Sequence, residues 1–230
     1  MRTVITSESP SVRGLPFALW NRRALEQKPL DVQNWLQNIY PLIARRAKEE
    51  SGIIYWADET AVVQDGHWVR GYAPAGQTPE LVASSKRFGL AMVSAVSNQG
   101  LVRFEFLEGA ANTQSTLGFM QKLVADSAGQ KVFLIMDNLR AHHAKDVTVW
   151  AQAHAAQIEL FYLPPYTPQL NPDEYLNRDF KTELRSAHRC STASGLRAQA
   201  TAFMEFLAMM PERVKSYFNH GSVVFAACSG

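Results

Sequence analysis

The sequence predicts an α/β fold built on a mixed five-stranded sheet flanked by helices, with a short helical appendage at the N-terminus. Two observations carry this prediction. Three strand-like runs follow one another without an intervening helix, at residues 53–60, 87–97 and 101–109. Two further apolar runs, at 131–137 and 158–163, alternate with helical stretches. A meander followed by alternating helices and strands gives a mixed sheet with helices on its faces.

The strands are recognised by their composition and by the turns between them. The first, fourth and fifth runs are short and almost continuously apolar, as expected for strands covered on both faces. The second and third runs are joined by a turn at Asn98-Gln99-Gly100. Asp65-Gly66 is a further hairpin signal, so the residues after it are expected to continue the sheet or to lie beside it.

Helices are expected where apolar residues recur at helical spacing. Those after the meander are predicted at residues 113–127, 144–155, 172–187 and 193–210, with a short one after Pro211. Before the sheet, a short helix is expected at 16–26. A longer one begins near Asp31, is divided by Pro41 and is closed by Gly52.

This order of elements is that of an RNase H-like fold. A chain of 230 residues is long enough for one sizeable domain with a small appendage. We therefore expect a helical linker region over residues 1–50 and the RNase H-like domain over residues 51–230.

The bulk composition excludes several classes of protein. The net charge of +2 is nearly neutral, so any nucleic-acid binding must come from local basic patches. Cys190 and Cys228 are far apart and fit no disulfide scaffold or cysteine-built zinc site, which agrees with a reducing cytoplasm. The sequence shows no signal-peptide core and no apolar run long enough to span a bilayer. A cytoplasmic protein without a membrane partner is expected.

Two aspartates follow the apolar runs of two buried strands. Asp58 ends the run of the first strand, and Asp137 ends that of the fourth. If these strands are parallel neighbours about 4.8 Å apart, both carboxylates project at the same sheet edge, where ligands of α/β proteins bind. A single Asp after a strand is more often a turn former or a helix cap. Two at equivalent strand ends make the functional reading more favourable, because like charges so close repel, so that a divalent cation must compensate them or one of them must be protonated.

A third candidate lies in the stretch 161–177, FYLPPYTPQLNPDEYLN. Asn171 is a suitable N-cap and Pro172 suits the first helical position, so Glu174 could simply complete a capping box. The prolines before them make the loop rigid, which a metal ligand requires and a cap does not. The loop therefore favours a positioned carboxylate at Glu174.

Basic residues follow Glu174 on the same helix face. Arg178, Lys181 and Arg185 lie four, seven and eleven residues after it, which suits a metal site beside a phosphodiester backbone. An ordinary solvated helix face, with Asp179 on another side, is the alternative. Three oxygen ligands indicate Mg²⁺ or Mn²⁺, and two such ions could flank a scissile phosphate.

Two histidines come shortly after Asp137, at positions 142 and 143. A zinc site would need further clustered ligands, which the sequence does not show here. One of the two could face a phosphate or the surroundings of the metal, and the simpler alternative is a solvent-exposed residue at a helix start.

Three motifs of the sequence resemble a known family. WADET at 56–60, IMDNLRAHHAK at 135–145 and FYLPPYTPQLNPDEYLNRDFK at 161–181 are similar to the three blocks of bacterial DDE transposases, and best to insertion-sequence family 630 of the mariner-like superfamily. Each block alone is weak evidence, whereas the combination is highly specific. The likeness covers about residues 28–220. Thr167 stands where the family has Ser.

The resemblance implies a metal-binding catalytic triad of Asp58, Asp137 and Glu174, and it sets aside their neighbours Glu59 and Asp173. It implies Mg²⁺- or Mn²⁺-dependent cleavage of DNA at the ends of a mobile element, followed by attack of the freed 3′-hydroxyl on target DNA, usually at a TA dinucleotide. It also implies terminal inverted repeats as partner DNA, a homodimer, and a bacterial protein that joins the nucleoid when bound to DNA. The DNA contacts expected are Asn138, His142, Arg178, Lys181 and Arg185.

The sequence departs from that family near its N-terminus. Transposases of this kind begin with two helix-turn-helix units, of which residues 13–23 resemble only a part. The resemblance therefore implies that residues 1–50 hold a remnant of the DNA-binding region and a helical linker, and that residues 51–230 form the DDE catalytic domain. An alternative reading is therefore a shortened DNA-binding remnant, or a partner of full-length transposase, without activity of its own. A third reading is an unrelated RNase H-like nuclease acting on RNA–DNA hybrids.

Overall fold

The computed structural model describes residues 28–64, 74–76, 88–186, 190 and 192–227. The helix expected at 16–26 and the hairpin signal at Asp65-Gly66 lie outside these residues. In the described part of the chain, no helix is both long and apolar enough to cross a membrane.

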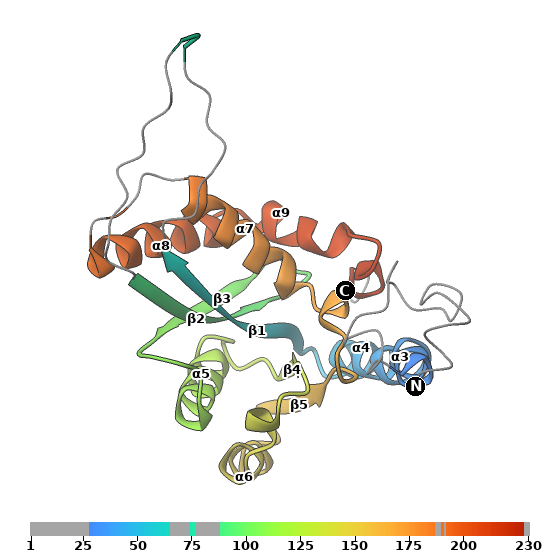
Figure 1. Ribbon diagram of the computed structural model, residues 1–230. Helices are drawn as coiled ribbons and strands as arrows, with labels where there is room; N and C mark the ends of the chain where they lie inside the picture. The colour runs from blue at the N-terminus through green and yellow to red at the C-terminus, as the bar shows by residue number, and fades with distance from the viewer. Residues whose placement is uncertain (1–27, 65–73, 77–87, 187–189, 191, 228–230) are drawn as a thin grey trace, which may run out of the picture.

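The described strands form one mixed sheet, as predicted, in the order β3-β2-β1-β4-β5 (Figure 1). Their bounds are β1 Ile53–Gln64, β2 Phe88–Val96, β3 Val102–Leu107, β4 Val132–Met136 and β5 Ile158–Tyr162. The first three strands pair antiparallel, whereas β1, β4 and β5 pair parallel. The prediction that the first and fourth strands are parallel neighbours is therefore confirmed.

Strand β1 is longer than the sequence predicts. Its parallel pairing with β4 covers only Ile53 to Trp56. It then continues to Gln64 because β2 supplies hydrogen-bonding partners along its other edge. The expectation that Asp58 stands at a strand end is therefore wrong. Asp58 lies in the middle of β1, just beyond the point where β4 stops pairing with it.

Helices cover both faces of the sheet (Figure 1). Helices α5 (Thr113–Ala125) and α6 (Lys145–Ala153) lie on one face, and α7 (Asp173–Ser186), α8 (Ala193–Ala208) and α9 (Pro211–Ser216) lie on the other. Side chains alternate along β1, so that Trp56 packs toward α7 and Ala57 toward α5. By the same alternation Asp58 faces the α7 side and Glu59 faces the α5 side.

The helical segment before the sheet is α3 (Pro29–Asn34), a π-helical turn η2 (Trp35–Ile39) and α4 (Tyr40–Glu49). Pro41, expected to divide this helix, lies in the first turn of α4. The interruption is the π-helical turn before it, where the N–H of Tyr40 donates to the carbonyl of Trp35. Trp35 and Ile43 are buried in the same core as Trp56. The domain boundary at residue 50 stays a prediction.

Gly100 closes the turn between β2 and β3 in a backbone conformation that suits glycine. Its φ is +86°, and an added Cβ would lie 2.7 Å from the carbonyl oxygen of Pro211. Gly100→Ala is therefore expected to lower the free energy of unfolding by about 2–4 kcal/mol, measured by urea denaturation. Gly118→Ala is the control, because an added Cβ there meets nothing within 4 Å in the middle of α5. It is expected to stabilise by about 0.5–1 kcal/mol. Equal effects of the two substitutions would contradict this account.

Candidate active site

The sheet register brings the two predicted aspartates to the same level. Trp56 of β1 pairs with Ile135 of β4. Two residues further along the sequence in each case stand Asp58 and Asp137, and Asp58 lies on the face of the sheet where Trp56 packs toward α7. Since β4 ends at Met136, Asp137 is the first residue of the loop beside the continuing strand β1. The parallel pairing of β1 and β4 thus determines the place of both carboxylates.

The loop rich in proline ties the start of α7 to β1. The buried side chain of Asn171 donates from Nδ2 to the main-chain oxygen of Ala57, at 2.9 Å. Its Oδ1 accepts from the main-chain N–H of Asp173 at 3.0 Å. Asn171 thus acts as a helix cap and also fixes the helix start beside Asp58. Glu174 directly follows Asp173 in the sequence.

Glu174 does not form the capping box that the sequence allows. Its N–H donates to the main-chain oxygen of Asn171 at 3.2 Å. Among the described residues, no hydrogen bond of its carboxylate is found, and the side chain is only half-buried. The carboxylate of Glu174 is therefore available for another partner.

The carboxylate of Asp58 is affected by the charges of the other two carboxylates of the predicted triad. The pKa of Asp58 is raised to about 8, first because the group is buried and then because of the negative charges of Glu174, Asp137 and Glu59. Its Oδ2 accepts from Nδ2 of Asn177 at 2.9 Å, and its Oδ1 accepts from the N–H of Glu59 at 2.9 Å. The structure thus places the charges of Asp137 and Glu174 close enough to Asp58 to raise its pKa. Such a group of mutually repelling oxygen donors fits a hard divalent cation.

Asp173 is buried on the same side of β1 as Asp58, against Ser94, the residue that pairs with Asp58. It is fully buried, and Oγ of Ser94 donates to its Oδ2 at 2.7 Å. Its Oδ1 is without a hydrogen-bond partner. Burial, followed by the charge of Asp58, raises its pKa well above the usual range. Asp173 is thus a buried acid behind the site, and Glu174 is the one of the pair nearer to solvent.

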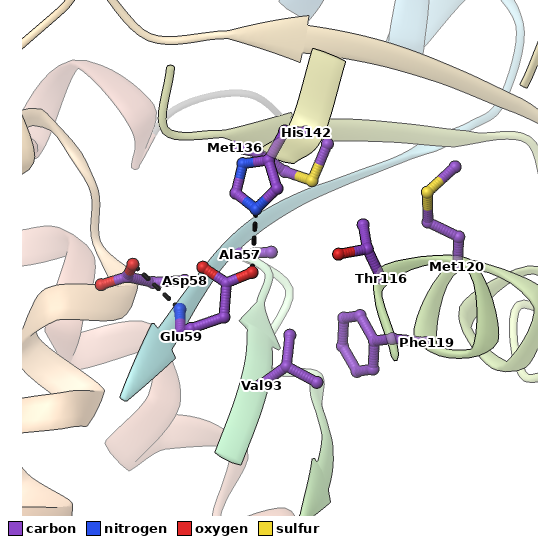
Figure 2. A pocket seen from close by; sticks show the side chains of 9 residues that line it. All are labelled: Ala57, Asp58, Glu59, Val93, Thr116, Phe119, Met120, Met136 and His142. Carbon is purple, nitrogen blue, oxygen red and sulfur yellow. Dashed lines mark hydrogen bonds and ion pairs between the residues drawn. The ribbon is translucent and has the colours of Figure 1, made fainter. Parts of the chain in front are cut away.

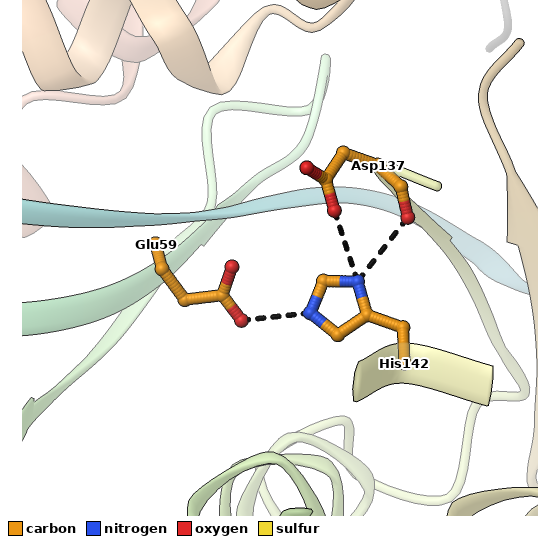
Figure 3. A group of neighbouring side chains, drawn as sticks. All are labelled: Glu59, Asp137 and His142. Atoms are coloured by element: carbon orange, nitrogen blue, oxygen red, sulfur yellow. Dashed lines mark hydrogen bonds and ion pairs between the residues drawn. The ribbon is translucent and has the colours of Figure 1, made fainter. Parts of the chain in front are cut away.

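A second carboxylate pair surrounds His142 on the other side of β1. Figure 2 shows Asp58 and Glu59 leaving the strand in opposite directions, with Glu59 pointing to His142. Nε2 of His142 lies 2.8 Å from Oε1 of Glu59, and Nδ1 lies 3.0 Å from Oδ1 of Asp137 (Figure 3). Burial lowers the pKa of His142, but its hydrogen bonds to Asp137 and Glu59 outweigh this and raise it to about 10. A protonated ring donating to both carboxylates accounts for these contacts.

Glu59, Asp137 and His142 also place one possible metal-ligand atom each within 4.8 Å of one another. They lie close because the ring hydrogen-bonds to both carboxylates, which occupies the nitrogen atoms that a metal would need. A hydrogen-bonded network therefore accounts for this cluster better than a separate metal site.

The residues expected to contact DNA differ in their exposure to solvent. Asn138, Arg178 and Arg185 are exposed, and Lys181 is half-buried on the same helix. In contrast, His142 is 3% exposed, and both of its ring nitrogens face groups of the protein. His142 is therefore directed at the carboxylates rather than at solvent.

Sequence reasoning missed three residues that shape the site. These are Glu59, set aside as a neighbour of Asp58, together with Ser94 and Asn177. A signal existed only for Asn177, which lies three residues after Glu174 and therefore near it on the helix face. Ser94 comes from β2, and only the antiparallel pairing of Asp58 with Ser94 reveals it.

Several solved structures of a transposase have a similar fold. The Mos1 mariner paired-end complex with Mn has a TM-score of 0.59 at 15% identity, with 94% of this chain and 68% of that chain covered. The Mos1 paired-end complex with left transposon end has a TM-score of 0.57 at 17% identity, with 87% of this chain and 64% of that chain covered. This chain therefore spans less than two thirds of the length of that protein. The catalytic domain of Mos1 mariner transposase has a TM-score of 0.53 at 16% identity, with 88% of this chain and 96% of that chain covered. These similarities show the RNase H-like fold.

A comparison with curated proteins gave no match. The family model described as DDE superfamily endonuclease matches residues 53–197, which is more than half of the chain. This segment runs from the start of β1 into α8 and contains every carboxylate of the site described above. The chain therefore belongs to the DDE superfamily endonuclease family.

Proposed function

We propose that this protein is a DNA transposase of the insertion-sequence 630 type, which cuts DNA strands and transfers them with Asp58, Asp137 and Glu174 as its catalytic triad. One observation carries the proposal: in a DDE endonuclease domain, the buried carboxylate of Asp58 on β1 is within the electrostatic reach of Asp137 after β4 and of Glu174 at the start of α7. Each carboxylate comes from a different element, and each element is fixed by the core or by Asn171.

The triad would hold one or two divalent cations, Mg²⁺ or Mn²⁺. The fit rests on the donor set, which is entirely of carboxylate oxygens, and on the burial and the neighbouring negative charges that raise the pKa of Asp58. When bound, such ions polarise the phosphate and activate the attacking hydroxyl. Asn177 orients Asp58 by donating to Oδ2, which leaves Asp58 fixed relative to α7.

The DNA backbone would lie along the exposed face of α7. Arg178, Lys181 and Arg185 give this face positive charge next to Glu174, and the exposed Asn138 lies one residue after Asp137. Asp179 does not neutralise the face, because Arg213 of α9 pairs with it at 2.8 Å. Structures of Mos1 hold a transposon end. By the motif resemblance we propose terminal inverted repeats, a TA target and a homodimer for this protein.

The proposal is tested by incubating the full chain with supercoiled plasmid, duplex and single-stranded oligonucleotides, and RNA–DNA hybrid, each with Mg²⁺, Mn²⁺ or EDTA. Nicked plasmid and cut duplex are expected with either metal, and intact DNA with EDTA. Duplexes that carry the terminal repeat should release a 3′-hydroxyl end that joins to TA sites. Cleavage confined to the RNA strand of hybrids, or unchanged in EDTA, would contradict the proposal.

A further inference from the structure

Glu59 and His142 lie on the far side of β1 from Asp58, and they contact Asp137 from there. The ring of His142 is almost completely buried, and its two nitrogens face Oε1 of Glu59 at 2.8 Å and Oδ1 of Asp137 at 3.0 Å. Nδ1 also lies 3.2 Å from the main-chain oxygen of Asp137. The three residues thus form a continuous chain of hydrogen bonds from β1 to the end of β4.

The main chain that carries the ring of His142 is held by a further hydrogen bond. His142 lies in the short 3-10 helix η3 (Arg140–His143), and the hydroxyl of Tyr162 on β5 donates to its main-chain oxygen at 3.0 Å. The main chain of His142 is therefore tied to β5. If the side chain of Asp137 rotates, the ring of His142 cannot move along with it.

These contacts select one orientation of the Asp137 carboxylate. Oδ1 faces His142 and, at 3.3 Å, the N–H of Leu139. Figure 3 shows the second carboxylate oxygen turned away from the ring. Asp137 is the first residue after β4 and is 35% exposed, so the sheet alone does not restrain its rotamer. Outer hydrogen bonds of this kind commonly fix ligand orientation at metal sites.

We propose that Glu59 and His142 are positioning residues, which hold Asp137 so that its second oxygen faces the metal-binding side of the site. The proposal rests on the proposed function, in which Asp137 is a metal ligand. Glu59 acts through the ring and contacts neither metal nor DNA. His142 cannot ligate a cation in this arrangement because both of its nitrogens are engaged.

The test is calorimetric titration of the full chain with MnCl₂, together with plasmid nicking at increasing Mn²⁺. Glu59→Ala is expected to weaken Mn²⁺ binding about 10- to 100-fold and to raise the Mn²⁺ concentration for half-maximal nicking by a similar factor. Glu59→Gln is expected to stay within about threefold of the wild type, because an amide still hydrogen-bonds to Nε2. Glu108→Gln, at an 89% exposed carboxylate, and His154→Ala are the matched controls.

Truncating the buried ring of His142 can disrupt folding. The substitutions are therefore made at Glu59, which is 19% exposed, and the melting temperature of every variant is compared with that of the wild type. Wild-type Mn²⁺ affinity in Glu59→Ala would overturn the proposal. Loss of affinity in Glu59→Gln equal to that in Glu59→Ala would also overturn it, because Glu59 would then be a ligand itself. If wild-type protein binds Mn²⁺ but does not nick DNA, the proposed function fails while the titration still decides the role of Glu59.

Discussion

Asp137→Asn is expected to lower the rate of metal-dependent DNA nicking by at least about a thousandfold, which corresponds to about 4 kcal/mol of transition-state stabilisation. The amide has nearly the shape of the carboxylate and can still accept from His142 through Oδ1. It removes the negative charge that a cation requires. Nicking of supercoiled plasmid, followed on gels over time at fixed Mg²⁺, measures the effect.

The control for this substitution is Asp126→Asn. Asp126 is a 42% exposed aspartate at the end of α5 that pairs with Arg103, and its replacement should change the nicking rate less than twofold. Both variants should unfold near the wild-type temperature. If Asp137→Asn nicks DNA as fast as Asp126→Asn, the assignment of the triad is wrong.

The adjacent acids on α7 allow a sharper comparison. Glu174→Gln should lower nicking as severely as Asp137→Asn. Asp173→Asn should keep most of the activity, because its side chain is fully buried and bonded to Ser94. The reverse order of effects would assign the third carboxylate to Asp173.

Asn171→Ala is expected to destabilise the protein by about 2–4 kcal/mol. The substitution leaves the main-chain oxygen of Ala57 and the N–H of Asp173 without their partners in a buried place. For a chain of this length, the melting temperature should fall by roughly 5–15 °C. Nicking should also slow below the melting temperature, because the start of α7, and with it Glu174, is no longer fixed to β1.

Asn34→Ala is the matched control for this loss. Asn34 is exposed and accepts one hydrogen bond from Asn38. Its replacement should change stability by less than about 0.5 kcal/mol. A melting temperature of Asn171→Ala within a degree of that of Asn34→Ala would show that the Asn171 bonds do not fix the loop.

Much of the fold could be predicted because local signals agreed with the tertiary arrangement. The apolar runs became β1, β4 and β5, and the helices expected after the meander begin within a residue of their predicted starts. The error at β1 has a physical cause. A strand ends where its partners end, and only the sheet shows that β2 continues beside Asp58 after β4 has stopped.

Local patterns of the sequence predict the three carboxylates proposed as metal ligands, but not the residues that support them. Strand ends, a rigid proline loop and motif spacing are local in sequence, so they indicated Asp58, Asp137 and Glu174. Ser94 and the link from Glu59 to His142 join residues 79 to 83 positions apart, and no local pattern encodes such contacts.

By itself, the sequence determined the order of elements, the resemblance to DDE transposases and the three carboxylates proposed to bind metal. Only the tertiary structure decided which neighbouring acid faces inward, and that His142 is a buried link between Glu59 and Asp137. The reason is that strand alternation and pairing register orient side chains in three dimensions. The side chains of adjacent residues such as Asp58 and Glu59 therefore lie on opposite faces of one sheet.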